Sequence, residues 1–339
     1  MLSALMNQDQ TLAVSNFLSL YERYLEADSS RSADRIMTRI ASIFDDNISL
    51  SYSGQPGLVS DSYGVFSGKS KALKAIKDFR SALSTKRFAS QEIIDNAFSV
   101  DFSNTAQPLT PLASKVAIIA EQDSKSIRTG LGFRLDNVIY LEVGENNLIT
   151  GIDISYDSYL MSEAITGRSD QVPNPDIEDI INKKRDSSTT TEQTITGSLN
   201  FFGAFAGIQS AEDLDILTGH VTTDVAVKFG GDPEILPFAD KKIRVGKSAL
   251  VRTFTEQLND SIPRIFDINE IFVKGDRFIS NTFEGRTAVP TGRDYDIPVN
   301  ILFTVSGGTD PKVSSIEGIF DSSITTTAFT GQYPFPVQA

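Results

Sequence analysis

The fold is decided by two short motifs, FDDNISL at residues 44–50 and FSGKS at residues 66–70. Each motif has a second version later in the chain, VTTDVAV at residues 221–227 and VGKS at residues 245–248. In both places a polar segment leads into an alternating strand, and a Gly-Lys pair then opens a helix. The chain therefore presents the same local plan twice.

The spacing of the motifs indicates an internal repeat. Asp224 lies 178 positions after Asp46, and Gly246 lies 178 positions after Gly68. Equal intervals at separate landmarks are the signature of a duplicated structural unit, which we call the first and the second copy.

A second pair of landmarks locates an insertion. Asp321 lies 164 positions after Asp157, and the Thr-Gly pair at residues 330–331 lies 164 positions after the pair at residues 166–167. The interval is shorter than before, so the first copy is about 14 residues longer than the second between its third helix and its last strand. We place the extra residues at 103–111, where SNTAQPLTP is rich in turn formers.

Both copies begin with helices and continue with strands. Apolar spacing in the first copy predicts helices at 11–27, 33–44 and 68–83, a turn at 45–47, and strands at 48–52, 93–102, 114–121, 130–143 and 148–156. In the second copy it predicts helices at 199–208, 211–221 and 246–258, and strands at 225–229, 268–274, 277–288, 296–305 and 313–320. Helices followed by adjacent strands favour an α+β class with an antiparallel sheet.

The domain organisation follows from the repeat and from a change in composition. The chain has 339 residues, enough for two domains. We predict a first domain at 1–167, a linker with a short helix at 168–196, a second domain at 197–334 and a tail at 335–339.

Composition excludes several classes of function. The formal net charge of −13 argues against a nucleic-acid binder, which needs clustered cations. The chain has no Cys and one His, His220, so it offers no thiolate or multi-histidine metal site, and we predict neither a metal nor a cofactor. No stretch approaches 18 apolar residues, so we predict no membrane span, and the start of the chain lacks the features of a secretory signal. A cytoplasmic location is the default expectation.

The repeated motifs resemble those of the nuclear transport factor two-like superfamily, also called SnoaL-like or cystatin-like. The similarity extends to the closing strands, IDISYD at residues 152–157 and IEGIFD at residues 316–321. It implies two tandem cone-shaped domains, each with three helices packed on a curved mixed or antiparallel sheet around an apolar cavity. This superfamily includes isomerases, dehydratases, cyclases, carriers and association modules, so the fold alone does not select a function.

The resemblance also indicates where catalytic acids would lie. The positions of the superfamily's first-strand base match Tyr52 and Phe229, and those of the closing-strand acid match Ile154 and Gly318. None of these residues is a carboxylic acid. We therefore expect a hollow that carries no ionisable residue able to move protons.

This expectation depends on which side chains of the closing strands point into the hollow. Alternation predicts that Ile152, Ile154 and Tyr156 point inward and that Asp153 and Asp157 point outward. In the second copy it predicts Ile316, Gly318 and Phe320 inward, with Glu317 and Asp321 outward. A register shift of one residue would reverse both faces.

The second copy is also distantly similar to the C-terminal domain of orange carotenoid proteins, through GRTAVP at residues 285–290 and VNILF at residues 299–303. That family holds a carotenoid oxygen with a Tyr and a Trp. The matching residues here are Phe201 and Phe303, which lack a hydrogen-bond donor, and the chain contains no Trp. The similarity therefore implies an apolar cavity.

Aromatic residues are the candidate lining of the two cavities. The proposed ligand-binding residues are Tyr21, Tyr24, Tyr52, Tyr156, Phe201, Phe205, Phe229, Phe303 and Phe320. A few polar tips on an apolar wall suit a ligand site. The same residues would serve equally well as core filling.

We predict a non-enzymatic tandem-domain protein that binds a small apolar molecule or mediates assembly, either as an intramolecular domain pair or as a homo-oligomer. The alternative is an isomerase, cyclase or dehydratase that acts on a polycyclic or polyketide-like substrate. That enzyme would use Asp101, Asp153 or Asp157 together with a nearby Tyr in the first copy.

Overall fold

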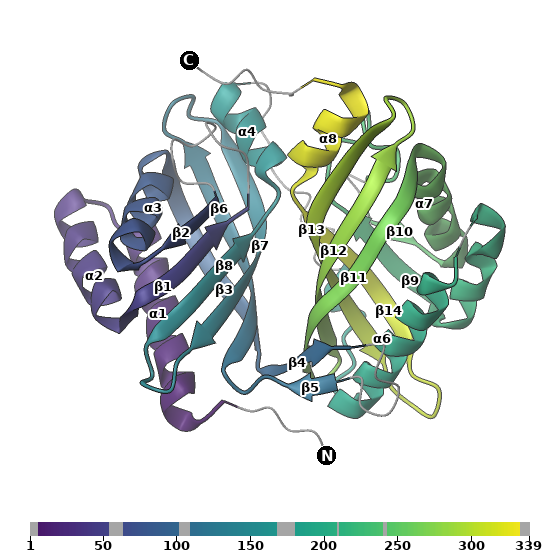
Figure 1. The fold of residues 1–339 in the computed structure, drawn as a ribbon, viewed down its shortest axis with the longest axis horizontal. Coiled ribbons are helices and arrows are strands. Elements are labelled where there is room, and N and C mark those ends of the chain that lie inside the picture. The colour runs from purple at the N-terminus through teal and green to yellow at the C-terminus, as the bar shows by residue number, and fades with distance from the viewer. Residues whose placement is uncertain are drawn as a thin grey trace. The chain divides into compact units, whose positions relative to one another are not determined.

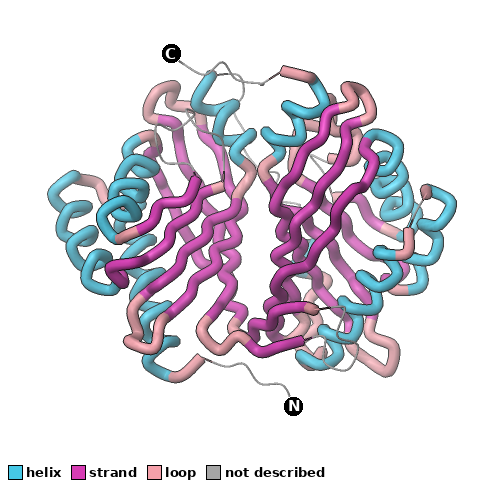
Figure 2. Tube along the Cα trace, viewed as in Figure 1, coloured by secondary structure: helices cyan, strands magenta, loops and turns pink. Residues whose placement is uncertain are grey.

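A computed structural model describes residues 6–53, 64–101, 109–167, 180–208, 210–239 and 243–332 (Figures 1 and 2). The chain divides into two compact units. The first unit comprises Met1–Ala97, Pro111–Pro173 and Phe335–Ala339, and the second comprises Phe98–Thr110 and Asn174–Pro334. Each is an α+β unit with one mixed sheet. The predicted tail at 335–339 lies outside the described residues.

The first unit holds a six-stranded sheet in the order β2-β1-β8-β7-β6-β3. Strands β1 and β8 are parallel, and the other neighbours are antiparallel. Helices α1 and α3 pack on strands of this sheet (Figure 1). The elements are α1 (Gln8–Leu25), α2 (Ser30–Ile43), β1 (Phe44–Tyr52), β2 (Gly64–Ser67), α3 (Lys69–Ser81), β3 (Leu83–Ile94), β6 (Lys115–Ser126), β7 (Gly132–Val143), β8 (Ile149–Ser155) and α4 (Ser158–Thr166).

The second unit repeats this order as β10-β9-β14-β13-β12-β11 and extends it with β4 and β5. Strands β9 and β14 form its parallel pair. The elements are α6 (Thr191–Ala206), the 3₁₀ helix η1 (Ala211–Gly219), β9 (Val221–Phe229), β10 (Arg244–Val245), α7 (Lys247–Asp260), β11 (Ser261–Lys274), β12 (Arg277–Ala288), β13 (Arg293–Ser306), β14 (Lys312–Phe320) and α8 (Ser322–Thr330), together with β4 (Asn96–Val100) and β5 (Leu109–Pro111).

The two sheets also share their irregularities. The register of β3 on β6 shifts between Thr85 and Arg87, and again between Ser90 and Glu92. The register of β11 on β12 shifts 178 positions later, between Pro263 and Ile265 and between Ile268 and Glu270. Bulges at matching positions set the same bend and twist in both strands, so corresponding residues can be compared between the units.

The insertion that we expected at 103–111 includes the short strand β5 and follows the short strand β4. Leu109–Pro111 forms β5, while residues 102–108 lie outside the described residues. Phe98–Thr110 belongs to the second unit, although the sequence suggested a first domain that runs through residue 167. The added strands follow β11 in the sheet order.

Two local predictions are corrected. The predicted turn at 45–47 lies within β1, which begins at Phe44, immediately after α2. The Asp45 carboxylate accepts a hydrogen bond from the Asn47 backbone N–H at 2.9 Å, so these polar residues take up the register shift of β1 on β8 and do not end the element.

The second correction concerns the start of α6, which we expected near residue 199. The helix begins at Thr191, inside the segment predicted as linker, because Thr190 and Gln193 form a capping box there. The predicted helix at 211–221 is a 3₁₀ helix that ends at Gly219.

In the closing strand of the first unit, the apolar side chains face the core as predicted. Ile152, Ile154 and Tyr156 belong to the hydrophobic core, as expected. Asp157, however, is buried at 8% exposure, because its carboxylate caps α4 and accepts the Tyr159 N–H at 3.0 Å. Its predicted outward position was wrong. Asp321 likewise is only 3% exposed and caps α8.

Candidate functional site

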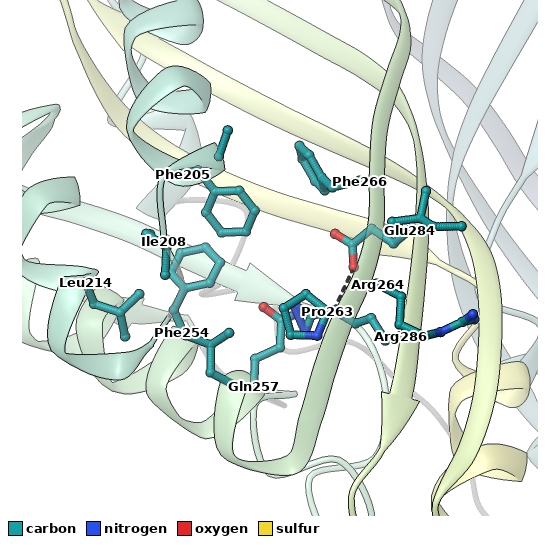
Figure 3. Close-up of a pocket in the computed structure, with 13 residues that line it drawn as sticks. Phe205, Ile208, Leu214, Phe254, Gln257, Pro263, Arg264, Phe266, Glu284 and Arg286 are labelled. Atoms are coloured by element: carbon teal, nitrogen blue, oxygen red, sulfur yellow. Dashed lines mark ion pairs between the residues drawn. The ribbon is translucent and has the colours of Figure 1, made fainter.

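The second unit contains a pocket of about 290 Å³ between α6, η1 and α7 on one side and β11 and β12 on the other (Figure 3). Most of the wall is apolar: Phe205, Ala206, Ile208, Leu214, Phe254, Leu258, Pro263, Ile265 and Phe266. The polar lining consists of Gln257, Arg264, Glu284 and Arg286. A mainly apolar wall with a few polar groups is the usual composition of a small-molecule site.

A smaller cavity of about 20 Å³ adjoins the pocket and shares four lining residues with it. Phe205, Phe254, Gln257 and Glu284 line both spaces and so mark their junction. The Phe205 ring lies 5.3 Å from that of Phe254 and 5.2 Å from that of Phe266, measured between ring centroids. These three rings form a continuous aromatic wall.

Strand β12 supplies the charged part of the site. Its inward-facing residues alternate and change from apolar to polar along the strand, in the order Phe278, Ser280, Thr282, Glu284 and Arg286, all of them buried. Arg286 Nε lies 3.4 Å from Glu284 Oε2. Burial raises the pKa of Glu284, and the Arg286 charge opposes that rise.

Arg286 is held in place from a second side. Its Nη1 donates to Ser261 Oγ at 2.8 Å, and that hydroxyl donates to the Gln257 backbone carbonyl at 2.7 Å. Burial raises the pKa of the neighbouring Tyr295. Arg286 is therefore fixed at the end of the pocket by Glu284 and Ser261.

The first unit has different residues at the matching positions. Gln122 pairs with Phe88 across the sheet, as Glu284 pairs with Phe266, so Gln122 corresponds to Glu284. The Gln122 amide donates to Thr85 Oγ1 at 3.2 Å and to Ser124 Oγ at 3.0 Å. A neutral, hydrogen-bonded network thus replaces the ion pair of the second unit.

The first unit also has a different residue at the position that corresponds to Gln257. Phe79 lies 178 residues earlier, and its ring stacks on Tyr52 at 5.0 Å and lies 5.9 Å from Tyr156. An aromatic ring fills the place in the first unit that an amide occupies beside the pocket of the second.

The predicted tyrosines all lie in the core of the first unit. Tyr21, Tyr24, Tyr52 and Tyr156 are each no more than 3% exposed. The Tyr21 and Tyr52 hydroxyls lie 3.1 Å apart in a hydrogen bond, and burial raises the pKa of both groups. The Tyr24 ring lies 5.3 Å from the Arg80 guanidinium. The structure brings Tyr21 and Tyr52 together, and a ligand role for the four tyrosines stays a prediction.

The predicted phenylalanines divide into two groups. Phe201, Phe205, Phe229 and Phe303 line the inner cavity, and Phe205 also lines the larger pocket. Phe320 is buried but lines neither space. Their contact with a ligand stays a prediction.

The expectation of a hollow without ionisable residues was wrong for the second unit, because Glu284 and Arg286 both line its pocket. They bury their charges as a pair, which is the condition under which such groups are found inside proteins. The sequence carried a signal: Glu284 and Arg286 stand two and four positions after Thr282, in phase with the core residue Phe278. Period-two alternation through this strand would have placed both inside.

The acids named for the enzymatic alternative lie elsewhere. Asp101 is exposed, Asp153 is half-buried, and Asp157 caps a helix. None of them lines the pocket of the second unit.

Comparison with known proteins gives matches to solved structures. An NTF2-like protein from Burkholderia xenovorans has 18% identity and a TM-score of 0.35 over 42% of this chain and 98% of its own. An NTF2-like protein from Burkholderia pseudomallei has 14% identity and a TM-score of 0.32 over 41% and 98%. A Mycobacterium tuberculosis protein in complex with estradiol-17β-hemisuccinate has 14% identity and a TM-score of 0.31 over 45% and 98%. The chain matches no family profile and no curated protein.

The described residues also bear on membrane spans and metal sites. None of their helices combines the length and apolar character needed to cross a lipid bilayer. Within the same residues, no group of three or more His, Cys, Asp or Glu side chains is arranged to hold a metal ion.

Proposed function

We propose that the second unit binds a small, mainly apolar molecule in the pocket between α6, α7 and β11–β12. The observation that carries this proposal is the pocket itself, in which nine of the thirteen lining residues are apolar. Its volume of about 290 Å³ is at the lower end of the range for ligand sites, which favours a compact ligand. The matching positions of the first unit are filled by Phe79 and by the Gln122 network, which supports a division of roles between the units.

Binding of a neutral naphthalene dye, N-phenyl-1-naphthylamine, tests this proposal. Its fluorescence rises in an apolar site, and we expect saturable binding to the intact protein. Ile208 lines the pocket and is 9% exposed, so Ile208→Trp places a larger ring there and should weaken binding about tenfold or more.

The control is Ile216→Trp, the same substitution at a position on η1 that is 56% exposed and does not line the pocket. It should bind the dye like the unchanged protein. Equal loss in both variants, or absence of saturable binding in the unchanged protein, would contradict the proposal.

One observation favours an enzyme as the second candidate. Glu284 is a carboxyl group at the junction of two apolar spaces, and burial raises its pKa. A carboxylate with a raised pKa suits proton transfer. An isomerase, cyclase or dehydratase would use Glu284 in place of the aspartates that we first considered.

Ring opening of 5-nitrobenzisoxazole tests this candidate, because the reaction needs only removal of one carbon-bound proton as the N–O bond breaks. After the rate in buffer alone is subtracted, we expect the rate of ring opening to be about a hundredfold lower in Glu284→Gln than in the unchanged protein. Glu212→Gln, the same exchange at an exposed position of η1 that does not line the pocket, is the control and should not alter the rate. Activity that persists in Glu284→Gln would exclude Glu284 as the base.

A further inference from the structure

We propose that the pocket of the second unit selects an uncharged ring compound that carries a hydroxyl group, and that this hydroxyl binds between the Glu284 carboxylate and the Gln257 amide. This inference names the class of ligand and rests on the proposed function of the same pocket.

The first support is an unmet need for hydrogen bonds. Glu284 is 7% exposed and Gln257 is 9% exposed, and both line the pocket and the inner cavity. Within the described part of the chain, the Gln257 amide has no hydrogen-bond partner, and the Glu284 carboxylate has only its ion pair with Arg286 at 3.4 Å. Neither group is among the fully buried polar atoms without a partner in the described residues, so both open onto the pocket, where a bound molecule can form hydrogen bonds with them.

The geometry places these two groups on opposite walls. Gln257 comes from α7 and Glu284 from β12, and Figure 3 shows both reaching toward the same space. A hydroxyl group can donate to a carboxylate and accept from an amide N–H at the same time. A single hydroxyl at the junction of pocket and cavity would therefore satisfy both.

The second support is the charge balance of the site. The negative charge of Glu284 is compensated by Arg286, and the positive charge of Arg264 is paired with Asp296 at 2.6 Å and with Asp294 at 3.5 Å. A charged ligand would bring an uncompensated charge into a mostly buried site, which is unfavourable. An uncharged polar group adds hydrogen bonds without this penalty.

The third support is the wall beside the two polar groups. The Phe205 ring contacts those of both Phe254 and Phe266 along the pocket. Aromatic walls favour ring compounds through offset or edge-to-face contacts. The first unit offers no equivalent, because Gln122 is already hydrogen-bonded to Thr85 and Ser124.

Four naphthalene probes test the inference: naphthalene, 2-naphthol, the 2-naphthoate anion and the 2-naphthylmethylammonium cation. They share the ring and differ in the polar group. The chain contains no Trp, so naphthalene fluorescence can be followed in the intact protein without a tryptophan background. We expect 2-naphthol to bind about tenfold more tightly than each of the other probes, because its hydroxyl gains hydrogen bonds to the Glu284 carboxylate and the Gln257 amide.

Gln257→Leu keeps the Glu284–Arg286 pair and removes the amide. It should reduce the preference for 2-naphthol over naphthalene severalfold while leaving naphthalene binding within about twofold. The control is Gln8→Leu, the same substitution at an exposed position of α1, which should leave the preference unchanged.

The outcomes separate the two proposals. If naphthalene binds as tightly as 2-naphthol, or a charged probe binds more tightly, this inference is overturned while the apolar site stands. If the preference survives Gln257→Leu unchanged, the assignment of Gln257 is overturned. If none of the four probes binds, the proposed function itself fails.

Discussion

Replacing Arg286 with Met is expected to destabilise the second unit by about 3–5 kcal/mol at neutral pH. Glu284 is 7% exposed, and Arg286, 3.4 Å away, is the positive charge that compensates it. Removing one partner of a buried ion pair leaves the other as an uncompensated charge in a poorly solvated site. Met has a similar length and keeps most of the packing of the arginine stem.

The loss should depend on pH in a defined direction. Burial already raises the pKa of Glu284 above its ordinary value of 4.5, and removing Arg286 takes away the charge that opposes this rise. An acid whose pKa is higher in the folded state contributes stability below its unfolded pKa and loses that contribution as the pH rises through the folded pKa. The defect of Arg286→Met should therefore be small in acid and grow toward neutral pH.

Hydrogen exchange followed by mass spectrometry on peptides of β12 and β13 measures the effect in the second unit alone. The double variant Arg286→Met with Glu284→Gln should recover most of the stability, since no buried charge is left. Arg264→Met is the matched control: this arginine is 32% exposed and pairs with exposed aspartates, so its loss should cost less than about 1 kcal/mol. A defect in Arg286→Met that does not change with pH would show that the charge of Glu284 is not its cause.

Replacing Phe79 with Ala is expected to destabilise the first unit by about 3–5 kcal/mol. The Phe79 ring is 2% exposed and stacks on Tyr52 at 5.0 Å, and it also lies 5.9 Å from Tyr156. Truncation would leave a cavity beneath α3 and remove contacts from both tyrosines.

The corresponding change in the second unit, Gln257→Ala, provides the comparison. Gln257 borders a pocket that already exists, so its truncation creates little new cavity and should cost less than about 1.5 kcal/mol. Exchange rates of peptides from α3 and β1, set against those from α7 and β9, report each unit separately. Similar losses at the two positions would contradict the view that the first unit is filled where the second is open.

Periodicity in the sequence was sufficient to predict the repeat, the class of fold and the inward-facing residues of the first closing strand. Ile152, Ile154 and Tyr156 alternate without interruption, and they lie in the core as predicted. The repeat interval of 178 residues, read from Asp46 and Gly68, reappears in the bulges of β3 and β11. Signals of this kind depend on residues that are close in the chain, so they can be read without knowledge of the tertiary structure.

The site depended on information that is not local. Glu284 and Arg286 were missed because paired charges inside a sheet look like a solvated strand face when their partner is not considered. Asp157 was placed outside for a related reason: its carboxylate accepts the Tyr159 N–H at the start of α4, and this hydrogen bond offsets part of the cost of burial. In both cases the partner decides the location, and the partner is seen only in the structure.

The strands β4 and β5 have a consequence for how the protein can be divided. They extend the sheet of the second unit, although their residues precede the closing strand of the first unit in the chain. A polypeptide that began at residue 174 would lack them, and the part of β11 that β4 covers would become a sheet edge with unpaired backbone groups open to association with other chains. A cut at residue 174 therefore does not separate the two sheets, because two strands of the second sheet stay with the first half of the chain.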